Sequence, residues 1–193
     1  MRHGNLFVIS GPSGAGKGTL VTRLLSKVED AWVSVSATTR KPRPGEIEGT
    51  HYLFVNDEAF DELVEQDGLL EWAPVHSARY GTPRKVVEQR IAEGCQVILE
   101  IDVQGAFQVK EKMPEAILLF IEPPSLAELE SRLVNRGTES RDVIEKRMNV
   151  ARLELSRKME YDVVLVNDNL DQAAGALVDL INSYAEHEED IDL

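Results

Sequence analysis

A glycine-rich segment near the start of the chain has the composition and spacing of a phosphate-binding loop. Its four glycines leave the backbone free to curl so that successive N–H groups point inward, and Lys17 adds a positive charge for the outer phosphates. An apolar run at 6–9 precedes it, and apolar residues at helical spacing follow it. This context predicts a strand, a loop and a helix that bind a nucleoside triphosphate, with ATP favoured. The expected contacts are Gly11, Pro12, Ser13, Gly14, Ala15, Gly16, Lys17, Gly18 and Thr19.

The residue after Lys17 departs from the usual pattern of such loops, which place a magnesium-ligating hydroxyl there. Here that residue is Gly18, and Thr19 follows it. The sequence therefore predicts that Mg²⁺ is held through the nucleotide and water without a direct protein ligand. Thr19 and Asp102 are the residues that could assist.

Arginines gather in two segments and could neutralise the charge of a moving phosphoryl group. Arginine binds phosphate oxygens bidentately and stays charged at every relevant pH. Arg40 and Arg43 lie on a Pro/Gly-rich stretch that predicts a loop. An irregular patch at 135–140 separates two predicted helices and is interpreted as a flap hinged at Gly137. Arginines in and around this flap are Arg132, Arg136 and Arg147.

Glu100 and Asp102 lie two residues apart at the end of a predicted buried strand, which would put both on one face at the ligand edge of a sheet. Buried carboxylates need a partner. An arginine, a magnesium-bound water or a purine N–H group could serve, and a functional partner is favoured. Five further residues have plain structural explanations when taken alone, such as a helix N-cap for the threonine: Ser36, Tyr52, Glu71, Tyr80 and Thr82.

The candidate site residues must be positioned by strands and helices, whose sequence patterns alternate along the chain. Apolar runs at 6–9, 96–101, 117–121 and 163–166 predict strands buried on both faces of a parallel sheet. Between them, a capping box at 125–128 and Thr82-Pro83, with Pro83 at the first helical position, mark helix starts, and Gly94 marks a helix end. The pattern predicts an α/β fold with a three-layer core and ligands at the carboxyl ends of the strands.

The stretch from about 34 to 72 breaks this alternation. Short apolar runs separated by proline and glycine predict a small mixed β-lobe inserted into the core, with one helix at 57–66 capped by Asn56 or Asp57. The residues alone predict a phosphotransferase with a phosphate loop and a second anion site on the inserted lobe. The residues do not identify the acceptor of the phosphoryl group.

Composition limits the partners. The 193 residues carry a net charge of −13, which argues against general affinity for nucleic acid or anionic membranes. No apolar stretch is long enough to span a membrane, the first residues run directly into a predicted strand, and Cys95 is the single cysteine, so a cytoplasmic protein is expected. Nothing in the sequence sets the oligomeric state, and a homo-oligomer is compatible with it.

Taken together, eight blocks resemble guanylate kinase, in order and spacing, over about 6–180. They are SATTRKPRPGE (36–46), GTHY (49–52), LEW (70–72), YGT (80–82), EIDVQG (100–105), FIEPPS (120–125), RGTE (136–139) and VND (166–168). The resemblance implies transfer of a phosphoryl group from ATP to GMP, with Mg²⁺. It also implies one domain over 1–193, with a core at 1–33, 83–125 and 158–186, a GMP-binding lobe at 34–82, a lid at 126–157 and an acidic tail at 187–193.

The resemblance also implies roles for the residues. Lys17, Arg40, Arg43, Arg136 and Arg147 would be catalytic, with the last two closing over the transferring group, and Asn167 would lie near adenine. The GMP phosphate would be held by Ser36, Arg40, Arg43, Tyr52 and Tyr80. Glu71 would accept from the guanine N1–H and amino groups, and Thr82, Asp102 and Glu100 complete the set of GMP-binding residues.

Two alternatives on the same scaffold are weighed against this interpretation. A kinase for a ribose bisphosphate has no guanine to recognise, so Glu71 with Thr82 argues against it. A scaffold protein that binds phosphopeptides at the GMP site has no need of an intact phosphate loop, which this chain has.

Overall fold

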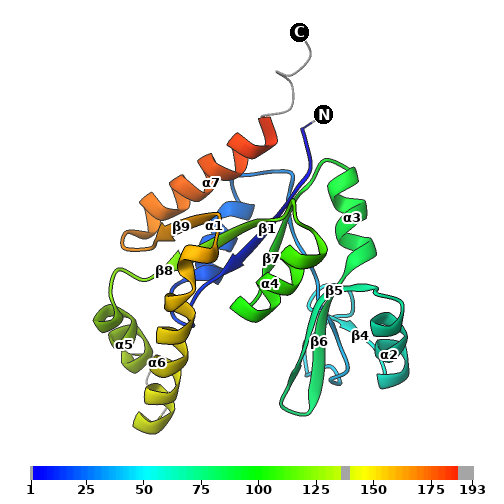
Figure 1. Cartoon of the computed structure of the whole chain (residues 1–193), viewed down its shortest axis with the longest axis horizontal. Coiled ribbons are helices and arrows are strands. Elements are labelled where there is room, and N and C mark those ends of the chain that lie inside the picture. Colours follow the sequence, from blue (N-terminus) through cyan, green and yellow to red (C-terminus); the bar gives the residue numbers. More distant parts are fainter. Residues whose placement is uncertain (1, 136–139, 187–193) are drawn as a thin grey trace.

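The fold is built on a five-stranded parallel sheet with the strand order β2-β7-β1-β8-β9 (Figure 1). The computed structural model describes residues 2–135 and 140–186. The strands of this sheet are β1 (Asn5–Ser10), β2 (Ala31–Val33), β7 (Gln96–Glu100), β8 (Ile117–Glu122) and β9 (Val163–Val166). The predicted parallel sheet is therefore confirmed, and the central strand β1 leads directly into the glycine-rich loop.

Helices cover both faces of this sheet because alternate side chains of β1 point to opposite sides. Phe7 and Ile9 belong to one apolar cluster with α1 (Lys17–Leu25) and α7 (Leu170–Glu186). Leu6 and Val8 belong to the other, with α3 (Arg84–Ala92) and α4 (Val103–Lys112). All four side chains are buried, which explains the unbroken apolar run in the sequence. The predicted three-layer α/β core is confirmed.

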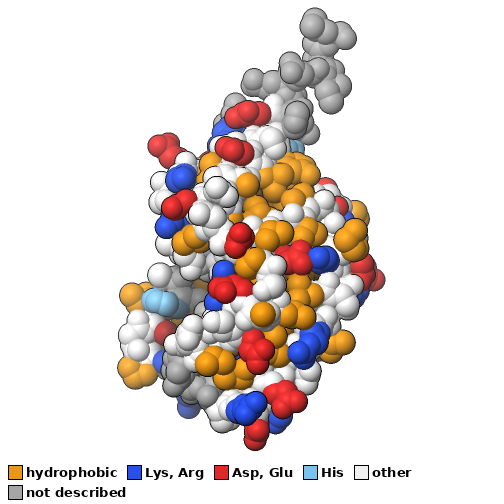
Figure 2. All heavy atoms as spheres, turned by 90° about the vertical axis from the view of Figure 1, so that its left-hand side faces the viewer, with side chains coloured by type: hydrophobic (Ala, Val, Ile, Leu, Met, Phe, Trp, Pro, Cys, Tyr) orange, Lys and Arg blue, Asp and Glu red, His pale blue; other side chains and the backbone are white. Residues whose placement is uncertain are grey.

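The strand β9, at one edge of the sheet, is less buried than β8 beside it. It pairs with β8 alone, and Val164 and Val166 are 37% and 51% exposed. The expectation that 163–166 is buried on both faces was wrong: Val163 and Leu165 pack against the apolar cluster of α1 and α7, whereas Val164 and Val166, on the opposite face, belong to none of the apolar clusters of the described residues. On the side of the molecule seen in Figure 2, apolar side chains lie between acidic and basic ones.

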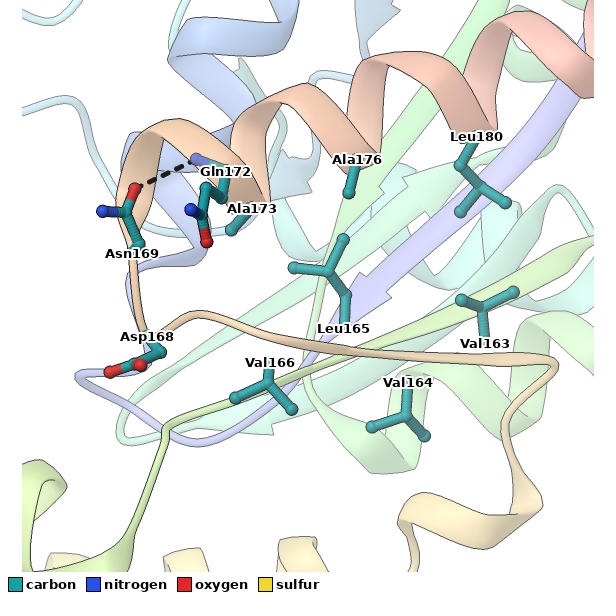
Figure 3. A pocket seen from close by; sticks show the side chains of 10 residues that line it. All are labelled: Val163, Val164, Leu165, Val166, Asp168, Asn169, Gln172, Ala173, Ala176 and Leu180. Atoms are coloured by element: carbon teal, nitrogen blue, oxygen red, sulfur yellow. Dashed lines mark hydrogen bonds between the residues drawn. The ribbon is translucent and has the colours of Figure 1, made fainter.

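A groove of about 400 Å³ lies between β9 and α7, and mostly aliphatic side chains line it (Figure 3). Asp168 is the one carboxylate among its lining residues, and Asn169 uses its side-chain oxygen to cap α7 by accepting from the N–H of Gln172 at 3.1 Å. The groove thus brings together no set of groups that could perform chemistry.

A second, mixed sheet has the order β4-β3-β6-β5 and lies beyond α4 in Figure 1. Its elements are β3 (Ala37–Thr38), β4 (Leu53–Phe54), α2 (Asp57–Glu65), β5 (Leu69–Val75) and β6 (Ala78–Pro83). A separate apolar cluster around Phe60 and Leu69 supports it. The inserted mixed β-lobe is confirmed. So is the helix start, since the Asn56 side chain accepts from the N–H of Ala59 at 2.8 Å.

Helix ends follow the predictions in part. Gly94, with φ of 84°, follows the last residues of α3 as expected. Ser125 accepts from the N–H of Glu128 at 3.1 Å at the start of α5 (Leu126–Asn135), although Glu128 itself pairs with Arg132 instead of completing the box. Thr82 is not the N-cap of α3. That position belongs to Pro83, because β6 continues to Pro83 and uses the threonine hydroxyl elsewhere.

The helix α6 (Arg141–Ser156) follows α5 and returns towards the main sheet through a short 3₁₀ turn at Lys158–Glu160. The predicted catalytic Arg136, the hinge Gly137 and the acidic tail at 187–193 lie outside the described residues. Within the described ranges, none of the helices is both long enough and apolar enough to cross a membrane.

Candidate active site

The glycine-rich loop between β1 and α1 has the backbone that a phosphate cradle requires. Gly11, Gly14 and Gly16 have φ values of 141°, 97° and 93°, which are unfavourable for other residues. A side chain would also collide at two of them, since its Cβ would lie 2.2 Å from the carbonyl oxygen of Ile121 at Gly11 and 2.4 Å from the Asn167 amide nitrogen at Gly16. The loop therefore depends on glycine for its close approach to β8 and to the residue after β9.

Lys17 is held over this loop by the loop's own carbonyl groups. Its Nζ donates to the oxygens of Gly11 at 2.6 Å and Pro12 at 3.3 Å. Burial lowers the pKa of Lys17, and the nearby carboxylate of Glu100 works against that shift. A polyanion would give this partly desolvated ammonium a stronger partner than two carbonyls.

Asn167 supports the loop from the end of β9. Its side-chain Nδ2 donates to the carbonyl oxygen of Ala15 at 2.8 Å, and the residue is buried. Its side-chain nitrogen is thus committed to holding the loop, a task that the sequence did not reveal. The adenine contact stays a prediction.

The carboxylates at the end of β7 are arranged differently from the expectation. The strand ends at Glu100, and Asp102 is the N-cap of α4, accepting from the N–H of Gly105 at 2.8 Å. Both are exposed, so the predicted buried pair on one strand face was wrong: the chain turns into a helix before the second carboxylate.

Glu100 faces the phosphate loop. A Cβ at Gly18 would lie 3.7 Å from each of its carboxylate oxygens, and Glu100 lines a cavity of about 260 Å³ with the loop. The other lining residues are Ser13, Gly14, Gly16, Lys17, Gly18 and Thr19. The structure thus places Glu100 with the predicted ATP-binding residues. A contact between Glu100 and GMP stays a prediction.

Glu71 is a buried carboxylate on the inserted lobe. It is 7% exposed, and the Thr82 hydroxyl donates to its Oε1 at 2.7 Å. Burial raises the pKa of Glu71, and the negative charge of Asp102 adds to this shift. Oε2 of Glu71 lies on the side of Gly105, where an added Cβ would be 3.2 Å away, and the two oxygens of a carboxylate together offer about four acceptor sites, so Glu71 is a strong acceptor.

A second group of predicted residues surrounds the Arg40 guanidinium. Its Nε donates to the Tyr80 hydroxyl at 3.1 Å, and its Cζ lies 5.3 Å from the centre of the Tyr52 ring, which itself packs edge-on against Tyr80. Ser36 directly precedes β3 in the same lobe, and Arg43 is exposed on the following loop. These side chains form a cationic, hydroxyl-bearing site on the lobe.

Glu46 holds this site together, and the sequence analysis assigned it no role. It accepts from Arg40 Nη2 and Nη1 at 2.8 and 2.9 Å, and from the backbone N–H of Arg43 at 2.7 Å. The hydrogen bonds from Arg40, followed by the one from Arg43, lower the pKa of Glu46 to about 2. The signal was an acid three residues after Arg43 across a Pro-Gly turn, which can fold back onto both arginines.

Replacing Glu46 with glutamine should raise the KM for the substrate predicted to bind at Arg40 by about tenfold, because a charge-assisted pair loses one acceptor and gains a repelling amide. The KM for the triphosphate should not change. Steady-state kinetics with Glu65→Gln, an exposed α2 residue, as control would measure this. Tighter binding in Glu46→Gln would instead mean that Glu46 competes with the phosphate.

The helices α5 and α6 bring basic residues to the loop. Arg147 and Lys146 on α6 line a cavity of about 240 Å³ together with Ser13. Arg132 on α5 pairs with Glu128 and also donates to the carbonyl oxygen of Asn167 at 3.4 Å. The predicted residues therefore fall into two groups, one around the loop and one on the lobe. Arg79, which received no role, is occupied by Asp57 and Asp61.

Comparison with known proteins agrees with this arrangement. The sequence model of the guanylate kinase family, described as "Guanylate kinase", matches residues 3–184. Curated guanylate kinases from Desulfitobacterium hafniense and Syntrophomonas wolfei are 51% and 52% identical; each alignment covers 93% of this chain, and 90% and 92% of the relatives. The crystal structure of guanylate kinase from Anaplasma phagocytophilum superposes with a TM-score of 0.73 at 34% identity, over 97% of this chain and 89% of that one. The likeness extends over nearly the whole sequence, and the chain belongs to the guanylate kinase family.

Proposed function

We propose that this enzyme transfers the γ-phosphoryl group of ATP to GMP, giving ADP and GDP. The observation that carries the proposal is the pairing of a glycine-rich anion cradle with a separate arginine and tyrosine site, next to which a buried carboxylate is available as an acceptor. One site suits a triphosphate, and the other suits a nucleoside monophosphate whose base has hydrogen-bond donors.

Base recognition would rest on Glu71. Guanine presents two adjacent donors, N1–H and the 2-amino group, whereas adenine has an acceptor at N1. A buried carboxylate fixed by Thr82 accepts from the first pattern and repels the second. Leaving such a group unpaired costs on the order of several kcal/mol, which is enough for about 10⁴-fold discrimination.

The GMP phosphate would bind among the residues around Arg40. The Arg40 guanidinium is already fixed by Glu46 and Tyr80, so it needs little further ordering, and Arg43 is exposed beside it. Ser36, Tyr52 and Tyr80 have hydroxyl groups that can donate to an anion. Arg40 and Arg43 would also hold the acceptor oxygen in line with the phosphorus.

Phosphoryl transfer would take place between the two sites. An oxygen of the GMP phosphate attacks the γ-phosphorus, and the bond to the bridging oxygen breaks as ADP leaves. Lys17 and the loop amides would stabilise the β- and γ-phosphates, and Arg147 with Arg136 would neutralise the transferring group. Closure of the lid would exclude water, which would otherwise hydrolyse ATP.

Mg²⁺ would bind with ATP and neutralise charge on its phosphates. The residues fit such a hard cation, because the carboxylate oxygens of Glu100 lie beside Gly18, next to Thr19, and could hold its water ligands. The described residues contain no group of three or more histidine, cysteine or acidic side chains that could bind a metal by themselves. We therefore propose coordination of Mg²⁺ through the nucleotide and water.

The purified protein with Mg²⁺ and ATP should produce GDP from GMP far faster than ADP from AMP. A coupled assay that follows ADP formation with GMP, AMP, CMP and UMP as acceptors would measure this preference. Equal rates with GMP and AMP would contradict the proposed base recognition. A ribose bisphosphate kinase, the competing interpretation, would have no use for the Glu71–Thr82 pair and should ignore all four nucleotides.

A further inference from the structure

The strand that bears Glu71 is irregular at that residue. In the pairing of β5 with β6, Leu69 is opposite Pro83 and Trp72 is opposite Gly81, so two residues of β5 face the single residue Thr82. This is a β-bulge, a feature that redirects side chains and is common beside active sites. It allows Leu70 to reach the main core while Glu71 meets Thr82. The direction of the Glu71 carboxylate therefore depends on the bulge.

The bulge lies in an edge strand, and a helix of the main core fixes both of its ends. β5 is the last strand of the small sheet, so one side of its backbone has no strand partner. Gln108 of α4 fills that place at Trp72: its Oε1 accepts from the Trp72 N–H at 3.1 Å, and its Nε2 donates to the Trp72 oxygen at 3.3 Å. Lys112, one turn further along α4, donates to the carbonyl oxygen of Leu69 at 2.7 Å.

The same face of α4 also touches the Glu71 side chain. Gly105 precedes Gln108 by three residues and therefore lies on the same face of the helix. A Cβ at Gly105 would lie 3.2 Å from Oε2 of Glu71 and 3.4 Å from its Cγ. Glycine at 105 thus leaves the space that the carboxylate occupies, and the N–H of Gly105 is itself fixed by Asp102.

We infer that Gln108 and Gly105 are positioning residues that set the selectivity for the guanine base. Gln108 holds the backbone next to the bulge as a neighbouring strand would, and Gly105 provides room for the carboxylate that the bulge directs. Neither residue needs to touch the nucleotide. The inference rests on the proposed function, since it assumes that Glu71 reads the base.

Two substitutions test it by independent routes. Gln108→Leu keeps the side-chain bulk but removes both hydrogen bonds to Trp72, and Gly105→Ala adds one methyl group against Glu71 while favouring the helix. The matched controls are Gln89→Leu, on the exposed side of α3, and Gly175→Ala in α7, where an added Cβ would meet nothing within 4 Å. Thermal unfolding identifies any variant that fails to fold.

Both variants should raise the KM for GMP by about tenfold, the effect of misaligning one hydrogen-bonded contact. The kcat and the KM for ATP should stay within about twofold of the controls, since the phosphate loop is not touched. The preference in kcat/KM for GMP over IMP, which lacks the 2-amino group, should fall as well. A purely structural role would lower the unfolding temperature without changing this preference.

The outcomes separate the inference from the proposed function. If the wild-type enzyme uses GMP no better than AMP, the proposed base recognition fails. If the wild type selects GMP and a folded variant keeps both the KM for GMP and the preference over IMP of its control, the inference alone is overturned. An equal rise in the KM for ATP and GMP also overturns it, because that result shows general loosening. Should Gln108→Leu not fold, Gly105→Ala decides the question.

Discussion

Glu71→Gln should lower kcat/KM for GMP by about 10³-fold, because the guanine N1–H and amino groups each lose a charged acceptor worth about 1.5–3 kcal/mol. The glutamine amide has a single acceptor oxygen, and its NH₂ group would face a donor of the base. The Thr82 hydroxyl can still donate to that oxygen, so the fold should persist. Activity with AMP, whose N1 is an acceptor, should rise relative to GMP.

Kinetics with both nucleotides measure this change, and Glu62→Gln on the exposed side of α2 is the matched control. The control should behave as the wild type. A Glu71→Gln enzyme that still prefers GMP over AMP by the wild-type ratio would show that another group reads the base.

The same carboxylate should make GMP recognition sensitive to pH. Burial raises the pKa of Glu71 above that of an ordinary glutamate, so the acceptor form is lost at a higher pH as the solution is acidified. The KM for GMP should therefore rise as the pH falls through this raised pKa. The GMP phosphate titrates too, so the informative quantity is the difference between the wild type and Glu71→Gln, in which the effect of residue 71 is absent.

Much of this architecture could be predicted from the sequence because it depends on local patterns. The unbroken apolar runs of β1 and β8 reflect burial on both faces, and the glycines of the loop mark backbone conformations that other residues rarely adopt. The cap of α2 was predicted as Asn56 or Asp57 for the same reason, and it is Asn56. Residues close together in the chain are enough to predict each of these features.

What the sequence did not reveal lies mainly in contacts between distant segments. Thr82 has the sequence context of a helix cap, but β6 extends past it, and its hydroxyl is needed by Glu71, eleven residues earlier in the chain. Gln108 of α4 binds the backbone of β5 beside a bulge, and the hydrophobic periodicity of the sequence does not reveal a bulge. Asn167 reaches a loop 152 residues away. Tertiary partners of this kind decide the fine geometry of the site, and the sequence contains them only implicitly.

The largest loss of rate is expected from Lys17→Met, which should reduce kcat by about 10³-fold, the loss found when a group that stabilises transition-state charge is removed. The methionine side chain can occupy the same space, but it brings no positive charge to the γ-phosphate. The hydrogen bonds of the Lys17 ammonium to described residues go to the carbonyl oxygens of Gly11 and Pro12, so its replacement should leave the fold in place. The affinity for GMP should not change, because the Arg40 site is separate.

Measurement of kcat together with calorimetric titration of ATP and GMP would test this expectation, with the exposed Lys27→Met as control. Lys17→Arg should also be slow. The ammonium fits between two carbonyl oxygens at 2.6 and 3.3 Å, and a planar guanidinium cannot enter the same space without displacing the loop. A Lys17→Met enzyme with kcat within about tenfold of the wild type would mean that the loop amides and the lid arginines stabilise the moving phosphoryl group without this lysine.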